Sequence, residues 1–232
     1  MDVITEGIAQ AFRLLLAGDR EVLGITLLSF AVSGAATVIS LVLGISMGTA
    51  IALNAFPGKK VVVSLVNTGM GLPPVVVGLW VSILLWRNGP LGFLGLLYTP
   101  TAMVIAQAII ATPIVTGITV GAIQGLPPAL RIQILALGAT RPQMIWLLLK
   151  EARLPVMAGV MAGFGGVISE VGASIMVGGN IKGYTRVLTT ATVMETGKGN
   201  FDVAIALSVI LLVASLAINY LLTLVQQRER PR

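Results

Sequence analysis

The side chains that most often carry out chemistry are scarce in this sequence. The 232 residues include no cysteine and no histidine, which excludes disulfides, thiolate nucleophiles, zinc sites built on these residues, Fe–S clusters and Ser-His-Asp triads. The nine acidic residues form no paired-carboxylate motif. Gly58-Lys59-Lys60 and Gly197-Lys198-Gly199 lack the other residues of a GxxxxGK[ST] phosphate loop. We therefore predict a chain that is not an enzyme, needs no cofactor and holds no metal.

One acidic residue stands inside an apolar stretch and is a candidate for handling a polar solute. An ionised Glu170 is costly there unless it is paired or near water. Ser169 and Gly172 offer little local compensation. Two hypotheses stay open: a structural hydrogen bond, or a partner from another helix that places Glu170 on the cytoplasmic half of a pathway.

A second candidate is a run of helix-breaking residues in another apolar stretch. Residues 67–74 read Asn67-Thr68-Gly69-Met70-Gly71-Leu72-Pro73-Pro74, which cannot continue a regular helix. Pro74 suits the first turn of a new half-helix. Broken backbone at membrane depth is tolerated where protein covers it or a water-filled cavity adjoins it. We predict that Asn67, Pro73 and Pro74 line a translocation pathway, with a buried kink as the alternative.

Two connecting segments are also informative. In 124–150, a helix from Pro128 is predicted to end near Gly138, and a second helix to start after Thr140 with Pro142 in its first turn. Such a segment invites docking by a soluble partner; an ordinary re-entrant loop is the alternative. In 179–200, a turn-rich entry precedes a short helix predicted over 187–194.

The elements that must position these residues are membrane helices. The chain is 56% apolar and 10% charged, against about 45–50% and about 25% in soluble domains. A helix that crosses the membrane needs about 20 apolar residues. We predict an all-α membrane protein of one domain with a helix on the outer membrane surface within 1–20 and spans at about 23–54, 61–86, 101–123, 156–178 and 203–225. A frayed N-terminus is the alternative to the surface helix.

The first predicted span carries a stripe of small residues. Four-residue steps join most of its members, which are Ser29, Ser33, Ser40, Gly44 and Gly48. Stripes of this kind let helix backbones approach closely. We interpret it as a packing face within the fold.

The charges fix the orientation. One side of the five spans carries nine basic and two acidic residues, and the other carries six of each. Because basic residues favour cytoplasmic loops, we predict that 55–60, 124–155 and the C-terminus are cytoplasmic and that the N-terminus is outside. The basic residues form no aromatic-interleaved stripe, so we predict no binding to nucleic acid.

The cytoplasmic segment 125–150 resembles the coupling motif of the membrane subunits of type I ABC importers. Gly138-Ala139-Thr140 matches the motif's glycine and its successors, although Ile132 stands where the motif has glutamate and Pro155 comes about four residues late. The resemblance implies that the segment docks a cytoplasmic ATPase dimer. The implied contact residues are Arg131, Leu135, Ala136, Leu137, Gly138, Ala139, Thr140 and Arg141.

Further motifs resemble the molybdate/tungstate branch of that family, especially tungstate permeases. They run in order over about 61–225 and are Leu72 to Leu79, Gly89-Pro90-Leu91-Gly92, Ala106-Gln107 with Pro113, Glu170-Val171-Gly172-Ala173, Gly179 to Thr185 and the beginning of the last span at Asn200. This resemblance implies a homodimeric permease in a prokaryotic cytoplasmic membrane. An external binding protein would deliver the oxyanion, with Asn180, Lys182, Tyr184 and Arg186 receiving it and gating its entry.

Several alternatives stay open. Tungstate is the expected oxyanion, and molybdate and sulfate are alternatives of the same class. A channel or secondary transporter would move the solute without an ATPase, and it would not need the docking segment 128–141.

Overall fold

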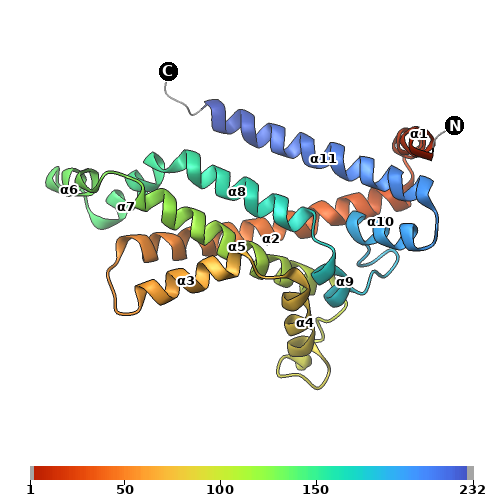
Figure 1. Ribbon diagram of the computed structural model, residues 1–232, viewed down its shortest axis with the longest axis horizontal. Coiled ribbons are helices and arrows are strands. Elements are labelled where there is room, and N and C mark those ends of the chain that lie inside the picture. The colour runs from red at the N-terminus through yellow and green to blue at the C-terminus, as the bar shows by residue number, and fades with distance from the viewer. Residues whose placement is uncertain (1–2, 229–232) are drawn as a thin grey trace.

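The computed structural model describes residues 3–228, with side chains described over 5–13 and 17–227. This part of the chain is helical, without strands. Figure 1 shows four helices along the length of an elongated bundle: α2 (Arg20–Leu53), α5 (Pro100–Gln124), α8 (Arg153–Ile168) and α11 (Phe201–Arg228). The predicted all-α class is confirmed. Arg230 and Arg232, which belong to the predicted cytoplasmic charge, lie outside the described residues.

Local sequence explains where the long helices begin. The Asp19 carboxylate accepts hydrogen bonds from the backbone N–H groups of Glu21 and Val22, both at 2.9 Å, and so caps α2. Thr99 caps α5 through the N–H of Ala102, and Pro100 occupies the first turn.

Two of the predicted spans are bent. In the described chain, α2, α5 and α11 are long and apolar enough to cross a membrane, and the number rises to five if each bent helix pair counts as one span. The first pair is α3 (Lys59–Met70) and α4 (Pro74–Leu85), which meet at 101°. The predicted break and the half-helix from Pro74 are confirmed.

The second bent pair corrects the sequence analysis, which gives no break within 156–178. There α8 ends at Ile168, and α9 (Gly172–Gly178) starts at an angle of 57°. The physical reason lies in residues 169–171: Glu170 turns its carboxylate onto the first turn of α9 instead of continuing α8.

Helices α2 and α5 form the most closely packed pair, and the small-residue stripe explains why. A methyl group on Gly44 would lie 2.7 Å from Val115 Cβ, and one on Gly48 would lie 2.7 Å from Thr119 Cβ. Larger residues at either position would push the two backbones apart. The interpretation of the stripe as a packing face is confirmed for these two glycines.

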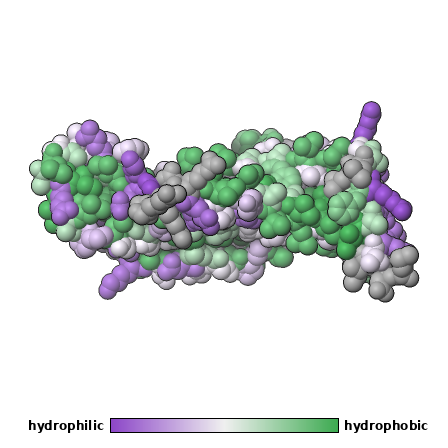
Figure 2. All heavy atoms as spheres, turned by 90° about the horizontal axis from the view of Figure 1, so that it is seen from above, coloured by the Kyte–Doolittle hydropathy of each residue, from purple (hydrophilic) through white to green (hydrophobic). Residues whose placement is uncertain are grey.

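Short helices gather at the two ends of the bundle. Figure 1 places α6 (Pro128–Ala136) and α7 (Arg141–Glu151) at one end and α1 (Val3–Leu16) and α10 (Leu188–Gly197) at the other. The predicted helices at 3–17, 128–138, after Thr140 and 187–194 are therefore present. On the face seen in Figure 2, hydrophilic side chains gather mostly near the two ends, and apolar side chains cover most of the stretch between.

Helix α1 lies across the bundle axis and packs on α11 (Figure 1). Gly7 allows this approach, because a Cβ there would lie 2.5 Å from Ile205 Cγ2. Ala11 is buried while Phe12 is exposed. This arrangement suits a helix that lies along a membrane surface.

Candidate functional site

The predicted docking segment forms a helix–turn–helix at one end of the bundle. Helix α6 ends in Gly138, whose φ of +84° is left-handed. The N–H of Gly138 donates to Leu135 O, and that of Ala139 donates to Ile134 O, which is the paired pattern of a glycine-terminated helix. Gln143 Oε1 then accepts from the N–H of Thr140 at 2.8 Å and fixes the start of α7. Gly138 therefore sets the turn between the two helices.

The two helices divide their apolar residues between a core and an exposed face. Ile134 of α6 is buried against Met144 and Leu148 of α7. Ile132 is 69% exposed and Leu137 is 87% exposed. Two large apolar side chains on one short helix at the end of the molecule form a surface that a protein partner can cover.

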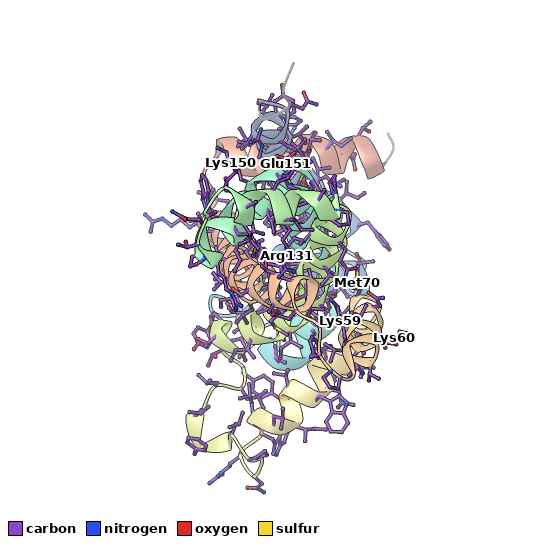
Figure 3. The ribbon with its side chains drawn as sticks, turned by 90° about the vertical axis from the view of Figure 1, so that its left-hand side faces the viewer. Lys59, Lys60, Met70, Arg131, Lys150 and Glu151 are labelled. Carbon is purple, nitrogen blue, oxygen red and sulfur yellow. The ribbon has the colours of Figure 1, made fainter. Side chains whose placement is uncertain are left out.

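Two cations bond to the end of α2, Arg131 from α6 and Lys59 from the start of α3. Arg131 Nη1 donates to Leu53 O at 3.0 Å, and Lys59 Nζ donates to Ala52 O at 3.2 Å and Asn54 O at 3.0 Å. Figure 3 looks onto this end, with Arg131 near its middle and Lys59 and Lys60 to one side on α3. The bonds satisfy carbonyl groups at the negative end of a helix dipole. Arg131 therefore joins α6 to the end of α2 directly.

The two helix breaks lie next to each other in the fold. A Cβ on Gly172 would lie 2.6 Å from Val75 Cγ2, and one on Gly78 would lie 2.7 Å from Ala173 Cα. Ser82 Oγ donates to Met176 O at 3.2 Å. Helices α4 and α9 therefore run side by side in the same direction, with both N-termini at the same level.

Glu170 caps one of these N-termini. Its Oε1 accepts from the N–H of Ala173 at 2.8 Å, and its own carbonyl accepts from Thr189 Oγ1 at 3.0 Å. The side chain is buried, with 7% of the residue exposed. The expectation of little local compensation is wrong, because the N–H of Ala173, in the first turn of α9, has no partner within the helix and bonds to the carboxylate. The structural hydrogen bond is the hypothesis that this contact supports.

The predicted pathway residues are only partly brought together. Pro73 and Pro74 start α4 beside α9, and so they lie near Glu170 in the fold. Asn67 lies on α3, before the bend, with an exposed side chain. Among the residues that the structure describes, no hydrogen bond or ion pair joins Asn67 to Glu170 or α9.

The predicted receiving residues lie at the opposite end of the bundle and share a partner that the sequence analysis missed. Lys182 Nζ lies 2.7 Å from Glu21 Oε2, and Arg186 Nη1 lies 3.6 Å from Glu21 Oε1. Asn180 Oδ1 accepts from Thr190 Oγ1 at 2.9 Å, while Tyr184 is exposed. Glu21 stands far from the other two in sequence, so no local pattern could have found this ion-pair group.

Buried hydroxyl groups hold the segment that presents these residues. Thr185 Oγ1 donates to Gly178 O at 2.6 Å and accepts from the N–H of Ile181 at 2.9 Å. Ser29 Oγ accepts from the N–H of Leu188 at 2.8 Å and joins α10 to α2. Together they fix the 179–188 segment against the bundle.

A second charged contact stabilises the end of α10. Hydrogen bonds from Asn200 and then Lys198 lower the pKa of the Glu195 carboxyl below its ordinary value of 4.5. Glu195 is therefore ionised at neutral pH and cannot act as a proton donor there.

The fold and these two ends define a class of protein that moves a solute across a membrane with the help of other subunits. Residues 22–231 match the family described as "Binding-protein-dependent transport system inner membrane component". The chain belongs to this family of multi-pass membrane permeases.

Relatives with curated descriptions agree with this class. A probable anion ABC transporter permease protein of Haloferax volcanii is 43% identical over 202 residues, covering 85% of this chain and 87% of that protein. The tungstate uptake system permease protein TupB of Peptoclostridium acidaminophilum is 40% identical over 227 residues, covering 98% and 100%. Permease proteins of molybdenum and sulfate transport systems match at lower identity.

A solved structure supports the fold. An inward-facing conformation of the MetNI methionine ABC transporter superposes with a TM-score of 0.74 at 18% identity, covering 94% of this chain and 99% of that chain. The fold is that of type I ABC importer permeases.

Proposed function

We propose that this chain is the permease subunit of an ATP-driven importer that carries tungstate across the cytoplasmic membrane of a prokaryote. A separate ATPase dimer hydrolyses the ATP, and an external binding protein delivers the oxyanion. The identity to a tungstate permease over nearly the whole chain supports the substrate. The positive charge at the α6–α7 end supports a cytoplasmic location for that end, with the N-terminus outside and the C-terminus inside.

The observation that carries the proposal is the exposed docking segment. Helix α6 leaves Ile132 and Leu137 uncovered, while Arg131 bonds to the end of α2. A soluble ATPase that grips these apolar side chains moves α6, and α6 then moves α2 and the packed α2–α5 pair. The docking segment would have no use in a channel or secondary transporter.

The direction of α4 supports a homodimer. At 101° to α3, α4 points away from the bundle in Figure 1, and the segment after it is irregular except for the short helix η1 (Gly92–Leu94). Trp80 is exposed, and Phe93 is 81% exposed. Large apolar side chains that stay exposed on a helix and on the loop after it form a surface that a partner can cover. A second copy of the chain, packed on α4 across a two-fold axis, would cover it and close the pathway beside Pro73 and Pro74.

The pathway binds its oxyanion weakly in this proposal. The segments that meet at Pro74 and Gly172 contain no lysine or arginine, and Glu170 already takes an N–H group at the start of α9. Hydroxyls, amides and the α4 N-terminus remain to shelter the anion. Selectivity therefore resides mainly in the external binding protein.

The coupling role of α6 is tested by Gly138→Asp with Gly58→Asp as its matched control. Both glycines have left-handed φ values, +84° and +81°, and an added Cβ meets nothing within 4 Å at either. The two variants therefore carry the same backbone cost and the same new charge. We expect Gly138→Asp to lower ATP hydrolysis that depends on loaded binding protein by at least about tenfold, equivalent to about 1.4 kcal/mol of lost coupling.

Gly58→Asp is expected to keep near-normal coupling, and both variants are expected to insert into the membrane in normal amounts. Wild-type coupling in Gly138→Asp would show that Gly138 is only a turn residue and would remove the main support for ATPase docking.

A further inference from the structure

A groove separates the end of α2 from the α6–α7 segment, and it has a volume of about 540 Å³. We call it the α2/α7 groove. Its walls come from one face of α2, from α6 and from one face of α7. The lining residues used below are Ile45, Thr49, Arg131, Leu135, Arg141 and Ile145.

The groove has an apolar end and a cationic end. Along α2 it runs from Ile45 to Asn54, which is about 13 Å at 1.5 Å per residue. Arg131 stands at the Asn54 end, because it donates to Leu53 O at 3.0 Å. On α7, Arg141 and Ile145 are four residues apart and so share a helix face.

The groove carries positive charge that no acidic side chain in its lining balances. Thr49 is 7% exposed, and among the described residues its Oγ1 has no hydrogen-bond partner. Arg131 and Arg141 form no salt bridge with any described residue. No aspartate or glutamate lines the groove. The site is thus positive, and its walls combine apolar side chains with the polar residues Ser46, Thr49 and Asn54.

The shape selects an amphiphile over a small ion or a protein. Most of the lining is apolar, and the volume is far larger than an inorganic oxyanion requires. Ile132 and Leu137, the exposed apolar side chains proposed to meet the ATPase, do not line the groove, whereas Arg131, Leu135 and Arg141 line it and are also among the implied ATPase contacts. Basic pockets between membrane helices at the cytoplasmic face bind anionic lipid headgroups.

We propose that the α2/α7 groove binds one anionic phospholipid, with its phosphate between Arg131 and Arg141 and an acyl chain along Ile45 and Ile145. The bound lipid stabilises the contact between α2 and the docking segment. The inference needs the membrane location of the family but not the identity of the transported anion.

The test uses the purified full-length chain, stripped of lipid, with bound lipids counted by native mass spectrometry. Phosphatidylglycerol and phosphatidylcholine with identical acyl chains are titrated in parallel, and inorganic phosphate forms a third arm. We expect phosphatidylglycerol to bind preferentially and Arg141→Gln to weaken it about fivefold, since one cation near a headgroup contributes about 1 kcal/mol. Arg141 is exposed, so this variant should fold.

Two further variants distinguish the effect of positive charge at this end of the molecule from the effect of the open volume of the groove. Lys60→Gln removes another exposed cation at the same end, on α3 and outside the groove (Figure 3), and is expected to leave binding unchanged. Ala50→Leu fills the groove from an exposed position on α2 without changing its charge and is expected to weaken binding.

Three results would overturn the inference. Equal binding of the two lipids, or wild-type binding by Arg141→Gln, would show that the groove has no site for an anionic headgroup. Displacement of the lipid by millimolar inorganic phosphate would make it a site for a free anion. Release of the lipid when the ATPase is added would make the groove part of the protein interface.

Discussion

Glu170 shows how a carboxylate can be accommodated inside an apolar helix bundle. Its Oε1 takes the N–H of Ala173 at 2.8 Å, at the positive end of α9. The same contact ends α8 and redirects the chain by 57°. The residue therefore shapes the break beside the proposed pathway, and its hydrogen bond to the N–H of Ala173 is the contact that the local structure shows.

Substitution of Glu170 separates these two contributions. Glu170→Gln keeps an oxygen that can accept from Ala173, whereas Glu170→Ala removes it. We expect Glu170→Gln to retain near-normal thermal stability and transport, and Glu170→Ala to lose about 0.5–2 kcal/mol, the usual cost of a missing cap. Melting in detergent and uptake in proteoliposomes measure the two effects. If Glu170→Gln is as damaging as Glu170→Ala, the negative charge itself is required.

At the scale of elements, the approach of α4 to α9 is what brings the two breaks together. It depends on Gly78, where a Cβ would lie 2.7 Å from the backbone Cα of Ala173. A backbone atom cannot move aside as a flexible side chain can, so any residue other than glycine must separate the helices. Close packing of this kind is sensitive to a single methyl group.

We expect Gly78→Ala to destabilise the protein by about 1–3 kcal/mol through overpacking. Gly34→Ala is the matched control, because it adds the same methyl group inside α2 where nothing lies within 4 Å. That control should be neutral or slightly stabilising, since alanine favours a helix over glycine by about 1 kcal/mol. Thermal melting of both variants in the same detergent makes the comparison. Equal melting temperatures would contradict the close α4–α9 contact.

The positions where helices begin and end are largely predictable from the sequence, because proline, glycine and capping residues act locally. Pro74, Pro128, Gly138 and Thr140 each mark a helix boundary within a few residues of the expected place. The break at Glu170 was not predictable, because its sequence neighbours do not reveal that the carboxylate will cap α9. The direction of α4 likewise depends on packing between distant segments.

The candidate sites also differ in whether local sequence or contacts between distant segments determine them. The docking turn follows from residues within one segment, whereas Glu21 pairs with Lys182 and Arg186 across most of the chain. Contacts of such separation form only when the whole bundle has assembled. Since Glu21 already neutralises part of this charge, an anion that bound here, as the proposed function requires, would compete with Glu21 for both cations.

At the scale of the molecule, the docking segment and the receiving residues lie at opposite ends of the bundle (Figure 1). A solute received at one end and energy supplied at the other require α2, α5, α8 and α11 to link them. Packed helices move as rigid bodies between alternative arrangements. The orientation of these two ends in the membrane is therefore central to the proposed mechanism.

Labelling of single cysteines tests the orientation, and the chain supplies a clean background because it contains no cysteine. We expect Lys198→Cys to react with a membrane-impermeant thiol reagent from outside and Arg141→Cys to react only after the membrane is opened. The physical reason is the excess of positive charge on the Arg141 side. The reverse pattern would contradict both the orientation and the placement of the ATPase.

Uptake by the reconstituted complex tests the central claim most directly. Proteoliposomes with this chain, its ATPase and a tungstate-loaded binding protein are supplied with ATP on the side of α6, and tungstate entry and ATP hydrolysis are measured together. We predict that both rise only when all components are present and that a binding protein locked without its anion supports little of either. Tungstate entry at the same rate without ATP or without the ATPase would contradict the account and identify a passive channel or secondary transporter instead.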